Sequence, residues 1–331
     1  MTTRICSVAG IDGGAGPFVS VLRATMAAMT ARWGVLGVPS SAGAHTPGLE
    51  KGPAAVRDAG LVDLLPGGAQ DHGDVSAFRW RPDTERPNAK NAAAVARIAT
   101  ETAIGVAGVL AAGQIPFVVG GDCSITIGVV AGFLNHGVRP ALLYFDGGPD
   151  LYTPETRPNG NIDAMVLAHL LATPGHVPLV AGVGPVVPLV GPQDVVSYGH
   201  TLPPEDTEFQ LLNEFGIDHV SADEIHADPL AAAQRARHQV EKRQASFLVH
   251  LDVDVLSFND VPLADVPDSG GDPAGLTLEE LIESLSVFAS SPSFAGLVLT
   301  ELNPDHAPDV DAIQRFLTAI GKALPVTPQA S

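Results

Sequence analysis

The chain has 331 residues, enough for one large α/β domain or two small ones, and 45% of them are hydrophobic, with a mean hydropathy of +0.21. That composition supports a sizeable core and is unlike that of a disordered protein. The 37 acidic residues outnumber the 18 basic ones, for a net charge of −19. Such a surface excludes nucleic acid and membrane phosphates as expected partners and suits small molecules, cationic ones included.

The chain ends and the cysteines frame one long folded unit. We expect residues 1–31 to be a loose extension, because organised sequence starts near Arg32. Glycines and a proline in this stretch interrupt the apolar core that a signal peptide would need. Residues 32–325 are predicted to form a single α/β domain, and 326–331 a short tail. The two cysteines, Cys6 and Cys123, cannot build a disulfide framework, so a cytoplasmic setting is expected.

No segment is expected to span a membrane. The long uncharged stretch Val177–Gln193 contains four prolines, which would break a spanning helix. Together with the acidic surface, this predicts a protein that acts on a small molecule and binds neither membrane nor nucleic acid.

Apolar, strand-like runs alternate with helical patterns along the chain. The predicted strands are Trp33–Val38, Asp74–Phe78, Ile115–Val119, Ala141–Asp146, Leu179–Gly184, Asp218–Ser221, Phe247–Asp252 and Gly296–Glu301. The predicted helices are Pro53–Leu65, Asn88–Ala112, Ile125–Asn135, Ala164–Leu171, Glu205–Phe215, Ala222–Gln244, Leu278–Ala289 and Val310–Leu324. This alternation predicts a parallel sheet with helices on both faces. Several strands are nearly all apolar, as buried parallel strands are.

Acidic residues follow several of the predicted strands. They are Asp122, Asp146 with Asp150, Asp252 with Asp254, and Glu301. Ligands of open α/β sheets bind beyond the carboxyl ends of the strands, so these groups should share one edge. A lone acid such as Asp122 also suits a turn or a helix cap. The two-acid loops instead favour a shared site for a divalent cation with oxygen ligands, such as Mg²⁺, Mn²⁺ or Ca²⁺.

These segments resemble the arginase/agmatinase (ureohydrolase) family from about Trp33 onward. "GVPSSAGAHTPGLEKGPAAVRDAGL" (Gly37–Leu61) is similar to the family's first strand, glycine-rich loop and helix start, and "HGDV" to its next motif. "GGDCS" stands where the family has GGDHS, "DGGPD" where it has DA-H-x-D, and "HLDVDVLSF" and "ELNP" match two later motifs. The resemblance implies a three-layer αβα sandwich around a mainly parallel sheet of about eight strands.

The resemblance also implies a metal site, with departures. Family members hold two Mn²⁺ ions with four aspartates and two histidines. The aspartates carry over to four acids of this chain: Asp146, Asp150, Asp252 and Asp254. The histidine positions hold Cys123 and Gly148, and the third aspartate of the family motif that "HLDVDVLSF" matches falls on Ser257. A family histidine thought to shuttle protons falls on Asp163.

We therefore expect at most one ion. Four carboxylates packed together need a counter-charge, or some of them must be protonated, which leaves a metal-free site open. Mn²⁺ or Mg²⁺ suits the acids, and a Cys123 thiolate would bias the site toward Zn²⁺; the alternative is a buried, inert thiol. A second ion would lack its nitrogen ligand at Gly148, so a hydroxide bridging two metals is not expected.

The expected substrate loop is rewritten relative to the family. The substrate-binding candidates are Tyr152, Arg157, Asn159, Asn161 and Glu301, and the catalytic candidates are Asp150, Asp163 and Glu301. Arg157 either clamps a carboxylate or phosphate or is a solvated loop residue. Glu301 contacts a guanidinium by the resemblance; otherwise it is a strand-end ion pair or cap. Asp163 either replaces the proton shuttle or caps a helix.

Three functional interpretations remain open. The first is a divergent hydrolase that cleaves a C–N bond of a guanidino, amidino or amino compound with a mononuclear or weakened metal site. The second is a repurposed enzyme of specialised metabolism that uses carboxylate acid–base chemistry without a binuclear manganese centre. The third is a non-catalytic, ligand-binding relative. Ordinary arginase activity is not expected, and a homo-oligomer, trimer or hexamer, is expected by analogy only.

Overall fold

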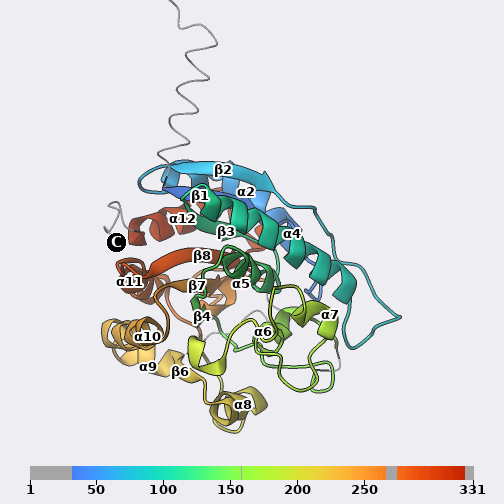
Figure 1. Ribbon diagram of the computed structural model, residues 1–331. Coiled ribbons are helices and arrows are strands. Elements are labelled where there is room, and N and C mark those ends of the chain that lie inside the picture. The colour runs from blue at the N-terminus through green and yellow to red at the C-terminus, as the bar shows by residue number, and fades with distance from the viewer. Residues whose placement is uncertain (1–31, 158, 266–273, 325–331) are drawn as a thin grey trace, which may run out of the picture.

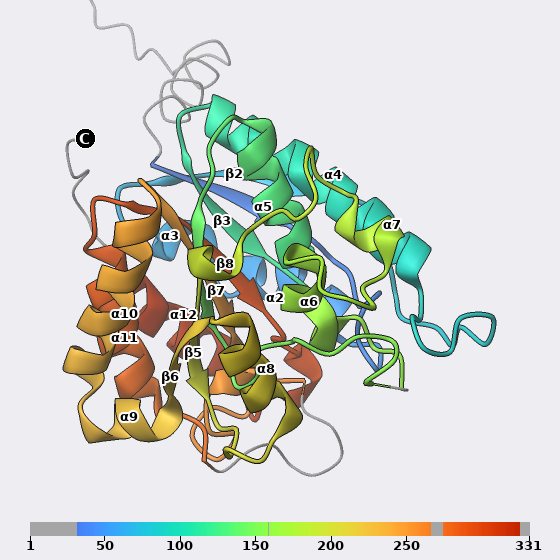
Figure 2. The same ribbon diagram turned by 60° about the horizontal axis from the view of Figure 1, so that its bottom comes forward.

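The computed structural model describes residues 32–157, 159–265 and 274–324 (Figure 1). The extension predicted for residues 1–31 and the tail predicted for 326–331 lie outside the described residues. Figure 2 shows helices on both sides of the central strands, with α4 and α5 on one side and α10 and α11 on the other. This arrangement is the predicted three-layer αβα sandwich.

The middle layer is one eight-stranded sheet, in the order β2-β1-β3-β8-β7-β4-β5-β6. The strands are β1 Trp33–Gly37, β2 Ala69–Asp74, β3 Ile115–Val119, β4 Ala141–Phe145, β5 Val195–His200, β6 Asp218–Ser221, β7 Phe247–Asp252 and β8 Phe294–Thr300. All their pairings are parallel, which confirms the predicted fold class. The four central strands, β3, β8, β7 and β4, are almost wholly buried because helices cover both faces.

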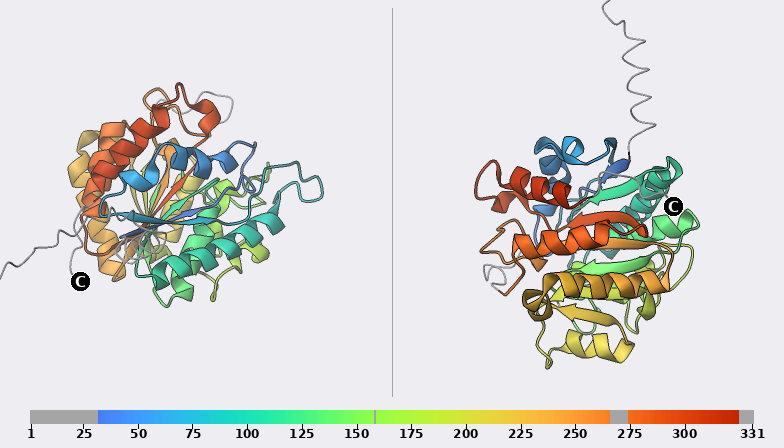
Figure 3. Two further views of the ribbon diagram at one scale, coloured as in Figure 1. Left: turned by 90° about the horizontal axis from the view of Figure 1, so that it is seen from above. Right: turned by 90° about the vertical axis from the view of Figure 1, so that its left-hand side faces the viewer.

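Eleven α-helices flank the sheet in the described residues (Figure 3). They are α2 Gly52–Asp58, α3 Leu61–Leu64, α4 Ala92–Ala111, α5 Ile125–Asn135, α6 Val166–Leu170, α7 Pro178–Ala181, α8 Thr207–Phe215, α9 Ala222–Ala227, α10 Pro229–Arg243, α11 Leu278–Ala289 and α12 Ala312–Ala323. Helices α4 to α7 pack on one another, and α9 to α12 do so on the opposite face with α2 and α3. Each helical layer closes one of two apolar cores against the sheet.

Two of the predicted strands are wrong in position. The strand predicted at Leu179–Gly184 is instead helix α7, and the fifth strand is Val195–His200. A short apolar run does not distinguish a strand from a buried helix by its period, and Pro178 at the first turn favours the helix. The strand predicted at Asp74–Phe78 lies earlier, at Ala69–Asp74. It escaped notice because this edge strand is half exposed and carries mostly polar side chains.

Two of the predicted helices are each interrupted once. Gly60 adopts a left-handed φ of 87° and separates α2 from α3 within the predicted Pro53–Leu65. Pro229 has no amide proton and starts a new helix, so the predicted Ala222–Gln244 becomes α9 and α10. The side chain of Asp228 caps α10 by accepting from the amide of Ala231.

Helix α4 is the one described helix that is long and apolar enough, by length and composition alone, to cross a membrane. In this fold it packs tightly against α5 and the sheet. Its buried positions, such as Val95, Ile98, Val106 and Val109, follow one helical face, which is the pattern of a core helix that covers a sheet.

Candidate active site

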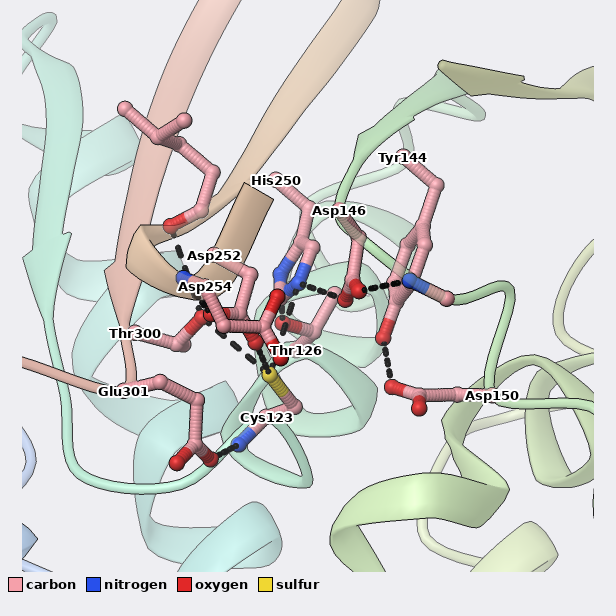
Figure 4. Close-up of polar contacts among 12 residues, drawn as sticks. Cys123, Thr126, Tyr144, Asp146, Asp150, His250, Asp252, Asp254, Thr300 and Glu301 are labelled. Carbon is pink, nitrogen blue, oxygen red and sulfur yellow. Dashed lines mark hydrogen bonds and ion pairs between the residues drawn. The ribbon is translucent and has the colours of Figure 1, made fainter. Parts of the chain in front are cut away.

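The carboxyl ends of the four central strands meet at one edge of the sheet. Asp146 follows β4 directly, Asp252 is the last residue of β7, Glu301 follows β8, and Cys123 lies in the turn after β3. The strand register aligns these ends, because Phe145 pairs with Leu251, and Asp252 pairs with Thr300. The predicted common edge therefore exists, and Figure 4 shows the side chains that converge there.

The floor of the site is a buried cluster of four ligand-type side chains, Cys123, Asp146, His250 and Asp252, which we call the floor cluster. Their ligand atoms all lie within 4.8 Å of one another. The Cys123 Sγ donates to Asp252 Oδ2 at 2.7 Å, and it lies 3.6 Å from His250 Nε2. His250 Nε2 is in turn 3.3 Å from Asp146 Oδ2 (Figure 4). Sulfur, nitrogen and oxygen ligands thus meet at one point.

His250 is the member of this cluster that the sequence analysis missed. Its ring stacks on Tyr144 with centroids 4.1 Å apart and an 8° tilt, because the two residues are register partners on β7 and β4. Its Nδ1 lies 2.8 Å from Thr126 Oγ1 on α5. Burial lowers the pKa of His250 to about 3, so the ring is neutral. The available signal was its spacing of two residues from Asp252, which puts both on one side of the strand.

The two acidic loops are held together by backbone hydrogen bonds. The amide of Asp254 donates to Asp252 Oδ1 at 2.7 Å, and the amide of Gly147 donates to Asp254 Oδ1 at 3.2 Å. The amide of Gly148 donates to Asp146 Oδ1 at 2.7 Å. Each carboxylate is therefore oriented by the turn that carries it or by its neighbour, before any ligand binds.

Two of the site acids sit on strained backbone. Asp150 has φ 51° and Glu301 has φ 59°, in the left-handed region that side chains with a Cβ seldom adopt. The amide of Glu301 donates to the Gly121 carbonyl at 2.9 Å, and the Glu301 carboxylate accepts from the Cys123 amide at 3.0 Å. The Tyr144 hydroxyl donates to Asp150 Oδ2. Strain held in this way is typical of functional positions.

Burial and mutual repulsion raise the proton affinity of the floor. The pKa of Asp146 is raised well above its usual value by burial and then by the charge of Asp150, and that of Asp252 by burial and then by Asp254. Burial and then Asp252 raise the pKa of Glu301 as well. Carboxyl groups so placed hold protons unless a cation lies among them. The floor is therefore built to receive positive charge.

The thiol of Cys123 is held in its protonated form by the same surroundings. Its pKa is raised well above the usual value by burial first, and then by the charges of Asp252 and Glu301. A nucleophilic cysteine needs nearby positive charge to form its thiolate. This cysteine is thus unsuited to attack a substrate directly, and it becomes a ligand only when a cation accompanies it.

A cavity of about 300 Å³ opens above the floor cluster. Its lining combines eight carboxyl groups with one guanidinium, from Arg157, and the imidazole of His45. The carboxyl groups belong to Asp146, Asp150, Asp163, Glu208, Asp252, Asp254, Asp265 and Glu301. Of the residues predicted for the site, which include Cys123, Asn159 and Asn161, all but Tyr152 line this cavity. Tyr152 lies beneath Arg157, whose Cζ is 4.8 Å from the centre of its ring.

Buried polar groups on the cavity rim lack partners. Among the described residues, Asn161 Oδ1 and Arg157 Nε are buried without a hydrogen bond. Asn161 is only 5% exposed, so water outside the cavity does not reach it. Buried polar atoms normally have a hydrogen-bond partner. Two buried atoms without one on the same part of the cavity indicate a surface that binds a polar ligand.

Glu208 is a rim residue that the sequence analysis did not foresee. It is the second residue of α8, which follows β5 in the chain, and its carboxylate accepts from the Leu151 amide at 2.7 Å. Burial raises its pKa to about 7. No local sequence pattern marks this residue as part of the site. Its place there depends on the position of β5, after which α8 follows in the chain.

Asp122 and Asp163 have different environments, although both are buried. Asp122 accepts from the amides of Gly43 at 3.0 Å and Ser124 at 3.1 Å, as well as from the Ser124 hydroxyl, so it supports the turn after β3. Asp163 faces the cavity, and its Oδ1 accepts from the Ala164 amide at 2.8 Å. Burial and then Asp122 raise the pKa of Asp163 to about 8.

The donor set does not fit two manganese ions. Gly148 has no side chain, and Cys123 supplies sulfur at the position where the family supplies nitrogen. The one imidazole of the floor, His250, belongs to the same cluster as Cys123 and leaves the Gly148 side without a nitrogen ligand. A single divalent ion fits the floor cluster, which offers four ligands around one point.

The fold and the site define a parallel α/β sandwich with an acidic, cation-seeking cavity at its strand ends. The family model described as "Arginase family" matches residues 31–320, and the chain belongs to this family. It is similar to the arginase of Brevibacillus brevis, with 31% identity over 83% of this chain and 92% of the relative. The Bacillus caldovelox arginase is 30% identical over 82% of this chain and 90% of the relative. A solved native structure of the Bacillus caldovelox arginase superposes with a TM-score of 0.79 at 26% identity, over 88% of this chain and 98% of that one.

Proposed function

We propose that this protein hydrolyses a C–N bond in a small cationic compound, with guanidino and amidino compounds as the first substrate class and amino compounds as the second. The observation that carries the proposal is the excess of eight carboxyl groups over one guanidinium around a 300 Å³ cavity. A cavity so charged attracts and concentrates cations. The relatives named arginases make a guanidino substrate the natural first choice.

The two ends of the cavity suit two ends of such a substrate. Glu301, held by the Cys123 amide at the inner end, is suited to a guanidinium or amidinium head. At the outer end, Arg157, Asn159 and Asn161 offer donors and acceptors for a polar tail, with Tyr152 stacked under the guanidinium. Arg157 is the group that would recognise a carboxylate or phosphate in that tail.

A single divalent ion on the floor carboxylates would supply Lewis-acid polarisation of the bond to be cleaved. The protein groups do the rest. Asp163, with its pKa raised to about 8 by burial, holds a proton near neutral pH and is suited to protonate a leaving amine. Asp150, oriented by the Tyr144 hydroxyl, also lines the cavity and is suited to accept a proton.

A ligand screen followed by a turnover assay tests this proposal. We expect guanidino, amidino or amino compounds to raise the melting temperature of the full chain, and anionic compounds to leave it unchanged. The stabilising compounds should then release ammonia, urea or an amine in the presence of divalent metal. Stabilisation by neutral or anionic compounds alone would contradict the charge argument on which the substrate class rests.

Urea release from arginine or agmatine should be negligible. The second ion would lack a nitrogen ligand at Gly148, and Arg157 and Tyr152 reshape the substrate end of the cavity. Catalysis depends on placement to within about 1 Å, so such changes suppress the ordinary reaction. Robust urea release from either compound by the natural chain would refute this account of the site.

A metal-independent acid–base enzyme is the second candidate, and the position of Asp163 favours it. A cavity-facing carboxyl with its pKa raised to about 8 is matched to proton transfer at neutral pH without any ion. Turnover of a stabilising compound that persists after complete removal of metal would select this candidate. Ligand binding without turnover under either condition would instead select a binding protein on the arginase scaffold.

The expected assembly and setting also stay proposals. We propose a homo-oligomer, trimer or hexamer, by analogy with the family, in a cytoplasmic setting suggested by the two cysteines. Light scattering of the purified full chain checks the assembly, and a monomer at micromolar concentration would contradict it.

A further inference from the structure

We propose that the floor cluster is a mononuclear site for a thiophilic ion of the zinc class, in which His250 supplies the nitrogen ligand. The ligands are Cys123 Sγ, Asp146 Oδ2, His250 Nε2 and Asp252 Oδ2. This inference deepens the proposed function, on which its catalytic meaning rests, by naming the ion and its first shell. In place of imidazoles on the loops after β3 and β4, this chain offers one imidazole from inside strand β7.

The distances between the ligand atoms match a tetrahedral zinc site at two edges. Zinc bonds of about 2.3 Å to sulfur and about 2.0–2.1 Å to nitrogen or oxygen imply edges of about 3.6 Å from sulfur to nitrogen and about 3.3 Å from nitrogen to oxygen. The Sγ of Cys123 lies 3.6 Å from His250 Nε2. That nitrogen lies 3.3 Å from Asp146 Oδ2.

The third edge is shorter. The Cys123 Sγ donates its proton to Asp252 Oδ2 at 2.7 Å. On binding, the S–H bond breaks, the proton leaves to solvent, and sulfur and oxygen each bond to the ion. The edge then opens by about 0.9 Å toward the tetrahedral value. The remaining pairs of ligand atoms lie within 4.8 Å of one another.

The ligand types select the metal class. Mg²⁺ and Mn²⁺ prefer carboxylate and water oxygens, whereas a set of one thiolate, one imidazole and two carboxylates favours Zn²⁺ and its analogue Co²⁺. The thiolate and the two carboxylates exceed the charge of a divalent ion by one unit. Such a ligand set therefore stabilises the ion strongly, and the ion in turn offsets the repulsion among the floor acids.

The imidazole is already oriented for binding. Thr126 Oγ1 lies 2.8 Å from Nδ1 and is positioned to accept its proton, which leaves the Nε2 lone pair facing the cluster. Stacking on Tyr144 at 4.1 Å fixes the plane of the ring. Metal-binding histidines are commonly oriented by such an outer-shell partner, and Thr126 occupies that place here.

The other site acids have separate partners. Asp150 accepts from the Tyr144 hydroxyl, and Asp254 Oδ1 accepts from the Gly147 amide at 3.2 Å. Both line the cavity above the floor cluster. We therefore assign them to the substrate side of the ion and not to its first shell.

Cobalt spectroscopy and zinc-edge X-ray absorption on the full chain, purified without chelator, test the assignment. We expect one sulfur and one imidazole in the first shell of bound Zn²⁺, and a thiolate-to-metal charge-transfer band when Co²⁺ is bound. The band should vanish in Cys123→Ser and persist in Cys6→Ser, which changes the only other cysteine of the chain.

The histidine is tested by affinity. His250→Gln should weaken Zn²⁺ binding by more than about 100-fold, beyond the roughly 10–100-fold that loss of an outer-shell partner costs. Thr126→Val, which keeps every ligand and guards against a misfolded histidine variant, should lose about 10–100-fold. His219→Gln, a change at a distant histidine, should leave the affinity unchanged.

Three results would overturn the inference: no zinc or cobalt bound by the folded chain, a first shell of oxygen atoms only, or unchanged affinity in a folded His250→Gln variant or in Thr126→Val. None of these measurements uses a substrate. A failed search for cationic ligands would therefore count against the proposed function alone, whereas an oxygen-only shell would count against this inference alone.

Discussion

The floor and the rim of the cavity differ in how fully their polar groups are satisfied. On the floor, Cys123, Asp146, His250 and Asp252 bond to one another or to nearby backbone amides. On the rim, Asn161 Oδ1 and Arg157 Nε are buried without partners among the described residues. The floor is built on strand ends, whereas these two rim residues belong to the loop that follows Asp150.

This difference separates two roles. Side chains on strand ends are positioned by the sheet and suit a fixed ligand such as an ion, because strands hold geometry better than loops do. Unpaired groups on a loop suit an exchangeable ligand, since each gains a partner only when that ligand arrives. The comparison thus assigns the ion to the floor and substrate discrimination to the rim.

The largest effect should come from removing the charges that we assign to the two substrate ends. Glu301→Ala and Arg157→Ala should each weaken binding of a stabilising ligand by roughly 2–5 kcal/mol, because a buried charge on the ligand then loses its partner. Titration calorimetry measures this, with Arg315→Ala as a control at an exposed ion pair with Asp309. Unchanged affinity in both cavity variants would show that these two charges do not select the ligand.

The turn after β3, which carries Cys123, should tolerate an added methyl group far less than the loop after β4 does. A Cβ at Gly121 would lie 1.7 Å from the Ser40 carbonyl oxygen, so Gly121→Ala should lose about 3 kcal/mol or more of unfolding free energy. At Gly148 the nearest atom would be 4.0 Å away, and Gly148→Ala should stay within about 0.5 kcal/mol. Urea unfolding of both variants measures the two losses of unfolding free energy. Equal losses would contradict the predicted difference between the two positions.

A smaller effect should appear in the pH dependence of stability. The pKa of Asp163 is raised by burial to about 8 and that of Glu208 to about 7, so the folded chain keeps protons that the unfolded chain has already lost. The unfolding free energy of metal-free protein should therefore fall as pH rises from about 4 to about 8. Asp163→Asn and Glu208→Gln should each recover roughly 1 kcal/mol or more at pH 8.

Thermal melts of chelator-treated protein at pH 5 and pH 8 check this sign. The natural chain should melt lower at pH 8, and each variant should narrow the gap between the two melts. A Glu279→Gln change on the outer helix α11 serves as a matched carboxyl control and should leave the gap as it is. A gap of equal size in all four proteins would mean that these two carboxyls are ionised in the folded state.

Much of the sheet was predictable because its strands carry strong local signals. Ile115–Val119, Asp218–Ser221 and Phe247–Asp252 have the predicted bounds, since each run is bordered by turn or capping residues. β2 and β5 were misplaced for opposite reasons. β2 is an exposed edge strand and mostly polar, whereas β5 follows a longer apolar segment that competes with it for the assignment.

The acids of the site were predictable from their place at the ends of strands. The other residues that join them in the site, His250 and Glu208, were not. Parallel strands bring Asp146, Asp252 and Glu301 to one edge whatever the loops do. The place of His250 in the cluster depends on the register of β7 against β4 and on its contact with Thr126 of α5. Glu208 reaches the cavity only through the packing of α8. Contacts of this kind arise from tertiary structure, which a local motif does not encode.

The backbone of the loop after β4 also bears on what the protein should do when the two missing histidines are restored. The φ of Gly148 lies outside the left-handed region, and a Cβ there would have only Glu208 Oε2 within 4 Å, so the backbone accepts a side chain at this position. Cys123→His combined with Gly148→His should therefore gain a second ion, and Asp163→His would add the family's proton shuttle. Urea release by the triple variant should still be weak, because the rim keeps Arg157 and Tyr152.

The central claim is that the floor holds one ion, so the most direct test is a count of metal per folded chain. Elemental analysis of the natural protein, purified without chelator and then equilibrated with excess Mn²⁺ and Zn²⁺ in turn and desalted, should give at most one tightly held ion. The Cys123→His/Gly148→His variant, treated identically, should give two with Mn²⁺. Two tightly held Mn²⁺ ions in the natural chain would contradict the account, as would a folded double variant that gains none.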